Sequence, residues 1–368
     1  MARSALSALV AVASFSYVAG QATLSTFPAT PIASLHFAYP SQVPYKVVPD
    51  QYARGTQFGY NICNSTTENQ QSLCQTAFVN GIDDFCILAP SQPNSTIGDT
   101  EGEEVIWCTK KGHGGRLIPD GTITGIQVLR NTNYVQLFAF LNQANIDISP
   151  PDFGGELDPH GQDLLGNPIG GLLYSTAFSS DNKTIQQINE WNMFVGGNTS
   201  AIKVCNPAGP NPAGFCQHTL DRIGWQYNMP NSAVNGVFEV CDSDAMDIPG
   251  VYTVNGQTLS YSQPPESLGP ISTLPYTARI PASSNCVTFQ SSALYTDLAS
   301  ISAPTPTGTS SGSTPTASGK GTAGTGTGTR SSSASTASST GKSNGAGTLT
   351  ASLFSSIVGV AFSIAFIA

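Results

Sequence analysis

Short runs of apolar residues, separated by glycine and proline, predict β-strands along most of the chain. The clearest run is Tyr134–Leu141, which combines apolar and aromatic residues and suits a central strand. Further strands are expected at residues 55–63, 121–129, 201–205, 237–241 and 251–261. One helix is predicted at residues 183–194, with Asp181 or Asn182 as its cap. The pattern favours a mainly β fold of the sandwich or barrel type.

Two segments of the chain share one pattern of cysteines. Ten residues separate the members of two cysteine pairs, and in both pairs an Asn follows the first member and a Gln the second: Cys63 and Cys74, and Cys205 and Cys216. Farther on, each segment has a β-rich run that ends in a cysteine, Cys108 or Cys241. We therefore predict two related, internally duplicated halves, residues 55–150 and 197–300, joined by a distinct insertion.

All eight cysteines lie between Cys63 and Cys286. An even number of cysteines in a secreted chain predicts disulfides, and no pair has the C-x-x-C spacing of a zinc site. Equivalent bonding in the two halves favours the pairs Cys63–Cys74, Cys86–Cys108, Cys205–Cys216 and Cys241–Cys286. The alternative pairs are Cys63–Cys108, Cys74–Cys86, Cys205–Cys241 and Cys216–Cys286. Spacing alone does not choose between the two sets.

Both ends of the chain differ in composition from the part between them. Residues 1–20 combine a basic residue, an apolar stretch and small residues, which predicts a signal peptide. Residues 303–347 are rich in Ser, Thr, Gly and Pro, which predicts a disordered, O-glycosylated stalk. Residues 348–368 are mostly apolar and follow small residues, which predicts a GPI-attachment tail with Asn344 or Ser343 as the attachment residue. A tail-anchored membrane span is the alternative.

The segment between these ends, residues 21–302, is acidic. It holds all 23 Asp and Glu residues and ten of the 14 Lys and Arg residues, so its formal charge is 10 − 23 = −13. Nucleic-acid binding needs a basic surface and is therefore excluded. The segment also contains four N-x-S/T sequons, which predict glycosylated surface positions at Asn64, Asn94, Asn182 and Asn198.

One short loop, flanked by Gly and Pro, concentrates the candidates for chemistry. It contains Glu156, Asp158, His160 and Asp163. Carboxylates and an imidazole can bind a divalent metal, for which the candidate ligands are Asp158, His160 and Asp163. Acid–base catalysis by Glu156, Asp158 and His160 is a second possibility. The favoured interpretation is structural, because Asp-Pro and Gly are typical of turns in which acids cap backbone N–H groups.

Outside this loop the sequence offers little catalytic chemistry. It has no G-x-S-x-G motif, and cysteines engaged in disulfides cannot act as nucleophiles. Trp107, Trp191 and Trp225 have rings that can stack on sugars, although large aromatic residues are more often part of a core. No cofactor is predicted.

Seven unusual runs resemble the basidiomycete glycoproteins known as macrophage-activating glycoprotein. The runs are GTQFGYNICNSTTE, WCTKKGHG, GGELDPHG, CQHTLDRIG, MDIPGVYT, QPPESLGP and IPASSNC. The resemblance covers the chain from about Tyr39 to Ser300. It implies a fungal extracellular glycoprotein, and it brings no catalytic residues to this chain.

Taken together, these features predict a non-enzymatic glycoprotein on the outer face of the plasma membrane or in the cell wall. It would serve wall organisation, adhesion or recognition, with cell-wall glycans as partners and a lipid anchor in the membrane. The alternative is an extracellular protein that binds or hydrolyses glycans with the acidic residues of segment 156–163.

Overall fold

A computed structural model describes residues 27–298 of the chain. This part is mainly β, which confirms the predicted fold class, with only short helical turns. The predicted signal peptide (1–20), stalk (303–347) and GPI-attachment tail (348–368) lie outside the described residues. Between residues 27 and 298, no helix has the length and apolar character that crossing a membrane requires.

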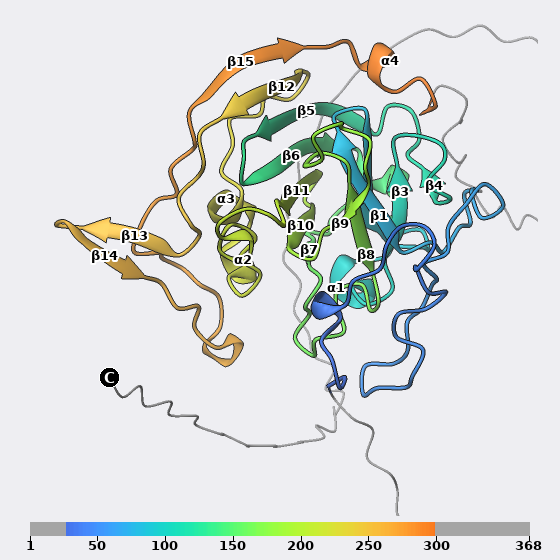
Figure 1. The fold of residues 1–368 in the computed structure, drawn as a ribbon. Coiled ribbons are helices and arrows are strands. Elements are labelled where there is room, and N and C mark those ends of the chain that lie inside the picture. Colours follow the sequence, from blue (N-terminus) through green and yellow to red (C-terminus); the bar gives the residue numbers. More distant parts are fainter. Residues whose placement is uncertain (1–26, 299–368) are drawn as a thin grey trace, which may run out of the picture. The chain divides into compact units, whose positions relative to one another are not determined.

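Two sheets form the framework (Figure 1). The six-stranded sheet has the order β4 (Arg116–Leu117), β3 (Val105–Cys108), β2 (Asp84–Ala89), β1 (Thr76–Gly81), β8 (Leu172–Ser175) and β9 (Gln186–Gln187). The seven-stranded sheet has the order β15 (Ser283–Thr288), β12 (Phe238–Ser243), β5 (Ile123–Arg130), β6 (Tyr134–Leu141), β11 (Thr199–Cys205), β10 (Trp191–Gly196) and β7 (Gly155–Leu157). A separate hairpin pairs β13 (Val251–Val254) with β14 (Gln257–Ser260).

The central strands of the seven-stranded sheet are buried on both faces, as β6 illustrates. Successive side chains of a strand point to opposite faces. On one face Val135 and Leu137 join the core that is shared with the six-stranded sheet. On the other face Tyr134 and Phe138 pack against the region of α2 (Pro212–Phe215) and α3 (Trp225–Asn228). Figure 1 shows these two turns on the side of the sheet away from β1 and β8. Burial of both faces explains why the sequence of β6 is almost wholly apolar.

The other helical elements are single turns. They are η1 (Ile32–Ser34), α1 (Ile97–Thr100), η2 (Gln143–Ile146), η3 (Asp221–Ile223), η4 (Glu266–Leu268) and α4 (Ser291–Leu294).

The predicted helix at residues 183–194 is wrong. Its C-terminal part belongs to β10, which pairs with β11 along its whole length. The two strands are joined by Gly197 and Asn198, both with positive φ, which is the backbone of a tight two-residue hairpin turn. The β-branched and aromatic residues of β10 and their burial outweigh the local helical pattern.

Two predicted strands also differ from the structure. Residues 55–63 form only isolated bridges. The buried side chains of Gln57 and Asn61 instead make hydrogen bonds to irregular backbone, at the N–H of Val47 and the carbonyl oxygen of Gly170. Residues 251–261 form the β13–β14 hairpin rather than a single strand. The residues Asn255 and Gly256, both with positive φ, make its turn.

The four disulfides join Cys63 to Cys74, Cys86 to Cys108, Cys205 to Cys216 and Cys241 to Cys286. This is the set that equivalent bonding favoured. In both halves one bond closes an 11-residue separation and the other joins antiparallel neighbours, β2 to β3 or β12 to β15. The halves are nevertheless interleaved, because the seven-stranded sheet takes β5 and β6 from the first half and β11, β12 and β15 from the second.

Candidate ligand site at Glu156

Glu156 lies in β7, an edge strand of the seven-stranded sheet. It is the register partner of Phe194 in β10, so both side chains point to the same face. The next residue, Leu157, points to the opposite face and is fully buried in the shared core. The face of Glu156 is the one covered by α3, whose Trp225 packs on Phe138 with ring centroids 4.4 Å apart.

A pocket of about 540 Å³ opens in front of this face. We call it the Glu156 pocket; its lining includes Phe153, Glu156, Phe194, Asp221, Arg222 and Trp225. Phe153 is 94% exposed, which is unusual for a phenylalanine and leaves its ring available to a ligand. The volume is within the range of small-molecule sites, which combine apolar walls with a few polar groups.

Glycines set the rim of the Glu156 pocket. A Cβ atom at Gly154 would lie 1.8 Å from the carbonyl oxygen of Val195, and one at Gly196 would lie 2.2 Å from the Cα of Gly154. Both glycines also have positive φ, which side chains disfavour. The close approach of these two backbones therefore requires glycine, and it presents Phe153 at the pocket mouth.

The carboxyl group of Glu156 loses contact with water without gaining a hydrogen bond at one of its oxygens. The residue as a whole is half-buried, but its Oε1 is buried and has no hydrogen-bond partner. Burial raises the pKa of Glu156 well above its usual range, and the nearby carboxylates of Asp158 and Asp221 raise it further. The group therefore keeps its proton to a higher pH than an ordinary glutamate. A protonated carboxyl can both donate and accept a hydrogen bond.

Asp158 closes a turn. Its Oδ1 accepts hydrogen bonds from the backbone N–H groups of His160 and Gly161, at 2.6 and 2.8 Å. This is the structural interpretation that the sequence favoured for the loop.

His160 belongs to a stacked histidine pair. Its ring lies on that of His218, with centroids 3.9 Å apart and planes inclined by 6°. Its Nε2 is 3.2 Å from a carboxylate oxygen of Glu190. Burial works to lower the pKa of His160, but the hydrogen bond and charge of Glu190 outweigh it and raise the pKa. Burial and then the charge of His160 lower the pKa of His218, so His160 is the member that takes the proton first.

Asp163 is engaged elsewhere. Its two oxygens accept hydrogen bonds from Nε and Nη2 of Arg54, at 2.9 and 2.7 Å. The same guanidinium donates to the carbonyl oxygen of Gly166 and to the side chain of Asn167. Asp163 thus fixes the loop to the N-terminal segment.

The structure brings together Glu156, Asp158 and His160, but not as a metal site with Asp163. In residues 27–298 the one group of three acidic, His or Cys side chains whose ligand atoms converge is Glu239, Cys241 and Cys286. Its two cysteines are joined in a disulfide and cannot ligate a metal.

Sequence reasoning missed several residues of this site. Phe153, three residues before Glu156, was not singled out although it is close in sequence. Asp221, which raises the pKa of Glu156, and Glu190, which pairs with His160, lie in distant segments that only the fold brings to this region. Trp225 was a candidate for sugar stacking only because it has a large aromatic ring. In the structure it lines the Glu156 pocket. Trp107 and Trp191 are at most 3% exposed and belong to the core.

All four sequon asparagines, Asn64, Asn94, Asn182 and Asn198, are exposed in the structure. Three of them, at 94, 182 and 198, have positive φ and lie in turns. Each side chain is therefore at a surface position that an oligosaccharide can occupy without displacing the core.

Two known proteins are similar to this chain. Appressorium protein ROW1 of Mycosarcoma maydis is 42% identical over 208 residues, which cover 56% of this chain and 48% of ROW1. Appressorium protein ROW2 of the same fungus is 38% identical over 205 residues, which cover 55% of this chain and 69% of ROW2. The chain thus spans about half the length of ROW1. No family model and no solved structure matches it.

Proposed function

Because the chain belongs to the family of the appressorium proteins ROW1 and ROW2, we propose that it is a non-enzymatic protein of the fungal cell surface that recognises wall glycans. Four disulfides support an extracytoplasmic location, since such bonds persist in oxidising compartments. Four exposed sequons agree with passage through the secretory pathway.

Attachment to the outer leaflet by a GPI anchor is part of this proposal. The composition of residues 303–368 supports it, with Asn344 or Ser343 as the attachment residue. We expect phosphatidylinositol-specific phospholipase C to release the protein from intact cells into the medium, because the enzyme cleaves the lipid from the anchor. Western blotting of medium and cells measures the release. Retention on the membrane after treatment, with release of a known GPI-anchored control, would favour the tail-anchored span.

Glycan recognition rests on one observation, the unpartnered and buried Oε1 of Glu156 beside the rings of Phe153 and Trp225. A sugar ring has an apolar C–H face and several hydroxyl groups. Aromatic rings pack on such a face, and a protonated carboxyl both donates to and accepts from hydroxyls. Wall organisation and adhesion are the roles that such binding would serve.

Substitution of Trp225 tests the proposal. We expect Trp225→Ala to weaken binding of a β-glucan or chitin oligosaccharide by about tenfold or more, because a stacking surface is lost. Isothermal titration calorimetry of the purified protein measures the affinity. Val234→Ala, at a position 60% exposed and outside the pocket, is the control. Wild-type protein that binds none of these oligosaccharides would refute glycan recognition at this pocket.

Substitution of Glu156 separates binding from catalysis. Glu156→Gln keeps a hydrogen-bond donor and an acceptor, so binding should change by less than about threefold. Glu156→Ala removes both and should weaken binding by about tenfold. If the wild-type protein releases shorter oligosaccharides and Glu156→Gln abolishes their release, the protein is a hydrolase that uses Glu156 as its acid.

A further inference from the structure

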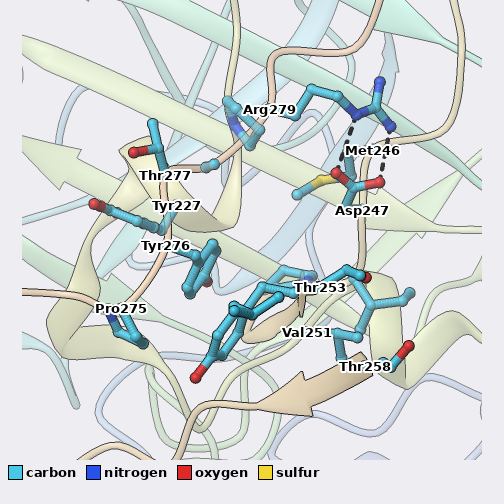
Figure 2. A pocket seen from close by; sticks show the side chains of 16 residues that line it. Tyr227, Met246, Asp247, Val251, Thr253, Thr258, Pro275, Tyr276, Thr277 and Arg279 are labelled. Atoms are coloured by element: carbon cyan, nitrogen blue, oxygen red, sulfur yellow. Dashed lines mark hydrogen bonds and ion pairs between the residues drawn. The ribbon is translucent and has the colours of Figure 1, made fainter. Parts of the chain in front are cut away.

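A second pocket, of about 570 Å³, includes Tyr227 of α3 in its lining (Figure 2). We call it the tyrosine pocket, after Tyr227, Tyr252 and Tyr276 in its lining. Tyr227 comes from α3, Tyr252 from β13 and Tyr276 from the long connection between β14 and β15. Side chains from three separate segments thus converge on one cavity of the size that small ligands occupy.

The three rings are held in a fixed arrangement. Tyr252 and Tyr276 are stacked, with centroids 5.1 Å apart and planes inclined by 6°. Tyr227 meets Tyr276 edge to face, at 5.3 Å and 83°. The hydroxyl of Tyr276 accepts a hydrogen bond of 2.9 Å from the backbone N–H of Gly250. Rigid tyrosines provide contact area at a low cost in conformational entropy.

The tyrosine pocket carries no net formal charge. Its two charged lining residues, Asp247 and Arg279, pair with each other through two hydrogen bonds of 2.8 and 3.0 Å, the dashed lines in Figure 2. Residues 21–302 as a whole have a formal charge of −13. A pocket that is neutral within such a strongly acidic segment favours an uncharged ligand.

Hydroxyl groups surround the rings. Thr253, Thr258 and Thr277 line the pocket and are exposed, so their hydroxyls are accessible to a ligand. The paired carboxylate and guanidinium add acceptors and donors at the rim. Flat apolar rings with neutral hydrogen-bonding groups around them complement a molecule that has an apolar face and many hydroxyls.

The long connection that forms one wall is ordered by specific contacts. It runs from Tyr261 to Ala282 and has only the turn η4 as regular structure. Arg222 donates to its carbonyl oxygens at Pro264 and Gly269, at 2.7 and 2.5 Å. Long connections without regular structure inside a folded unit are uncommon and are usually functional.

We propose that the tyrosine pocket binds a neutral saccharide. If the Glu156 pocket also binds one, as under the proposed function, α3 contributes to both sites. That single turn supplies Trp225 to the Glu156 pocket and Tyr227 to the tyrosine pocket. The proposal stands independently of whether the Glu156 pocket binds a ligand. Two such sites would let one protein hold two stretches of a glycan, or two glycans.

Calorimetric titration of the full-length purified protein tests this proposal. The probes are a β-1,3-glucan hexasaccharide and a chitin hexasaccharide, with a polyuronate and a glucosamine oligomer as charged counterparts. We expect Tyr252→Leu to weaken neutral saccharide binding at one site by about tenfold, because a stacking ring is lost. We expect Trp225→Ala to leave that site within about twofold of wild type.

Tyrosine substitution can also loosen the β13–β14 hairpin, so a second variant is needed. Thr258→Val removes an exposed hydroxyl at constant shape and leaves the rings in place. It should weaken binding by about three- to tenfold, the usual worth of one hydrogen bond, with an unchanged melting temperature. Unchanged affinity in both Tyr252→Leu and Thr258→Val would overturn the proposal. So would binding of the charged oligomers alone.

The outcomes also separate the two pockets. Loss of affinity in Trp225→Ala alone would support the Glu156 pocket and refute the tyrosine pocket. Loss in Tyr252→Leu and Thr258→Val alone would do the reverse.

Discussion

Replacing both Cys241 and Cys286 by alanine is expected to lower the free energy of unfolding by about 4 kcal/mol. The bond spans a sequence separation of 45, the largest of the four disulfides, and longer loops restrict the unfolded chain more. It also ties β15, whose residues are all exposed, to β12. Equilibrium unfolding in guanidinium chloride, monitored by tryptophan fluorescence, measures the change.

The matched control is the pair Cys63→Ala and Cys74→Ala. Its separation is 11, for which the same relation gives about 3 kcal/mol. A smaller loss for the pair at 241 and 286 than for the pair at 63 and 74 would mean that chain entropy does not govern the stabilisation. Both double variants remove two thiols, so no unpaired cysteine complicates the comparison.

Stability is also expected to fall as the pH rises from about 4.5 towards neutrality, because Glu104 is buried without adequate partners. Glu104 is fully buried; Thr100 donates a 2.7 Å hydrogen bond to its Oε1, while its Oε2 has no partner. Burial raises the pKa of Glu104 well above its usual range, and the charges of nearby acids raise it further. Glu156 behaves in the same way.

Stability falls with rising pH because the folded state holds the proton of Glu104 more tightly than the unfolded state does. A carboxyl with a raised pKa in the folded state contributes its full stability below its unfolded pKa, about 4.5, and loses it as the pH rises through the folded value. Asp84 acts in the opposite direction at lower pH. Burial works to raise the pKa of Asp84, but the hydrogen bond and charge of His113 outweigh it, so its stabilisation is lost only as the medium becomes more acidic.

Glu104→Gln is the variant that tests this expectation. It should flatten the decline of the melting temperature between about pH 4.5 and 7, and raise the free energy of unfolding at pH 7 by about 1–3 kcal/mol. Differential scanning fluorimetry across this range gives the profile. Glu103→Gln, at the exposed neighbouring position, is the control and should leave the profile unchanged. A profile for Glu104→Gln as steep as that of wild type would contradict the assignment.

Local pattern was sufficient to predict much of the β framework. The predicted strand Tyr134–Leu141 has the same bounds as β6. Burial on both faces requires an almost wholly apolar sequence, and a short run of this kind predicts a buried strand. The spacing of the cysteines also predicted part of the structure. The matched separations in the two segments favoured one pairing, and that pairing is found in the structure.

Residues 183–194 show where local pattern fails. The run can satisfy a helix on its own, but pairing with β11 and burial of Trp191 and Met193 decide its conformation. These contacts lie outside the window in which periodicity is read. The turn residues Gly197 and Asn198, which follow an apolar run, are a signal for a hairpin that the prediction of a helix overlooked.

The candidate site was predictable only in part. Glu156, Asp158 and His160 are near one another in sequence, so their proximity was expected. Phe194 and Asp221 reach the same pocket through the pairing of β7 with β10 and the position of η3, which a single sequence does not reveal. The sequence also did not reveal that Arg54 engages Asp163, because 109 positions separate them.

The interleaving of the two halves determines what happens when the chain is truncated. A fragment that ends after β6 would lack β11, the neighbour that completes the hydrogen bonding of β6 along one edge. It would also lack β12, the parallel partner of β5. Both inner strands would then become open edges flanked by apolar surface, which is a template for aggregation. A premature stop codon between residues 150 and 197 should therefore yield insoluble material that is degraded, and not a working half-size protein.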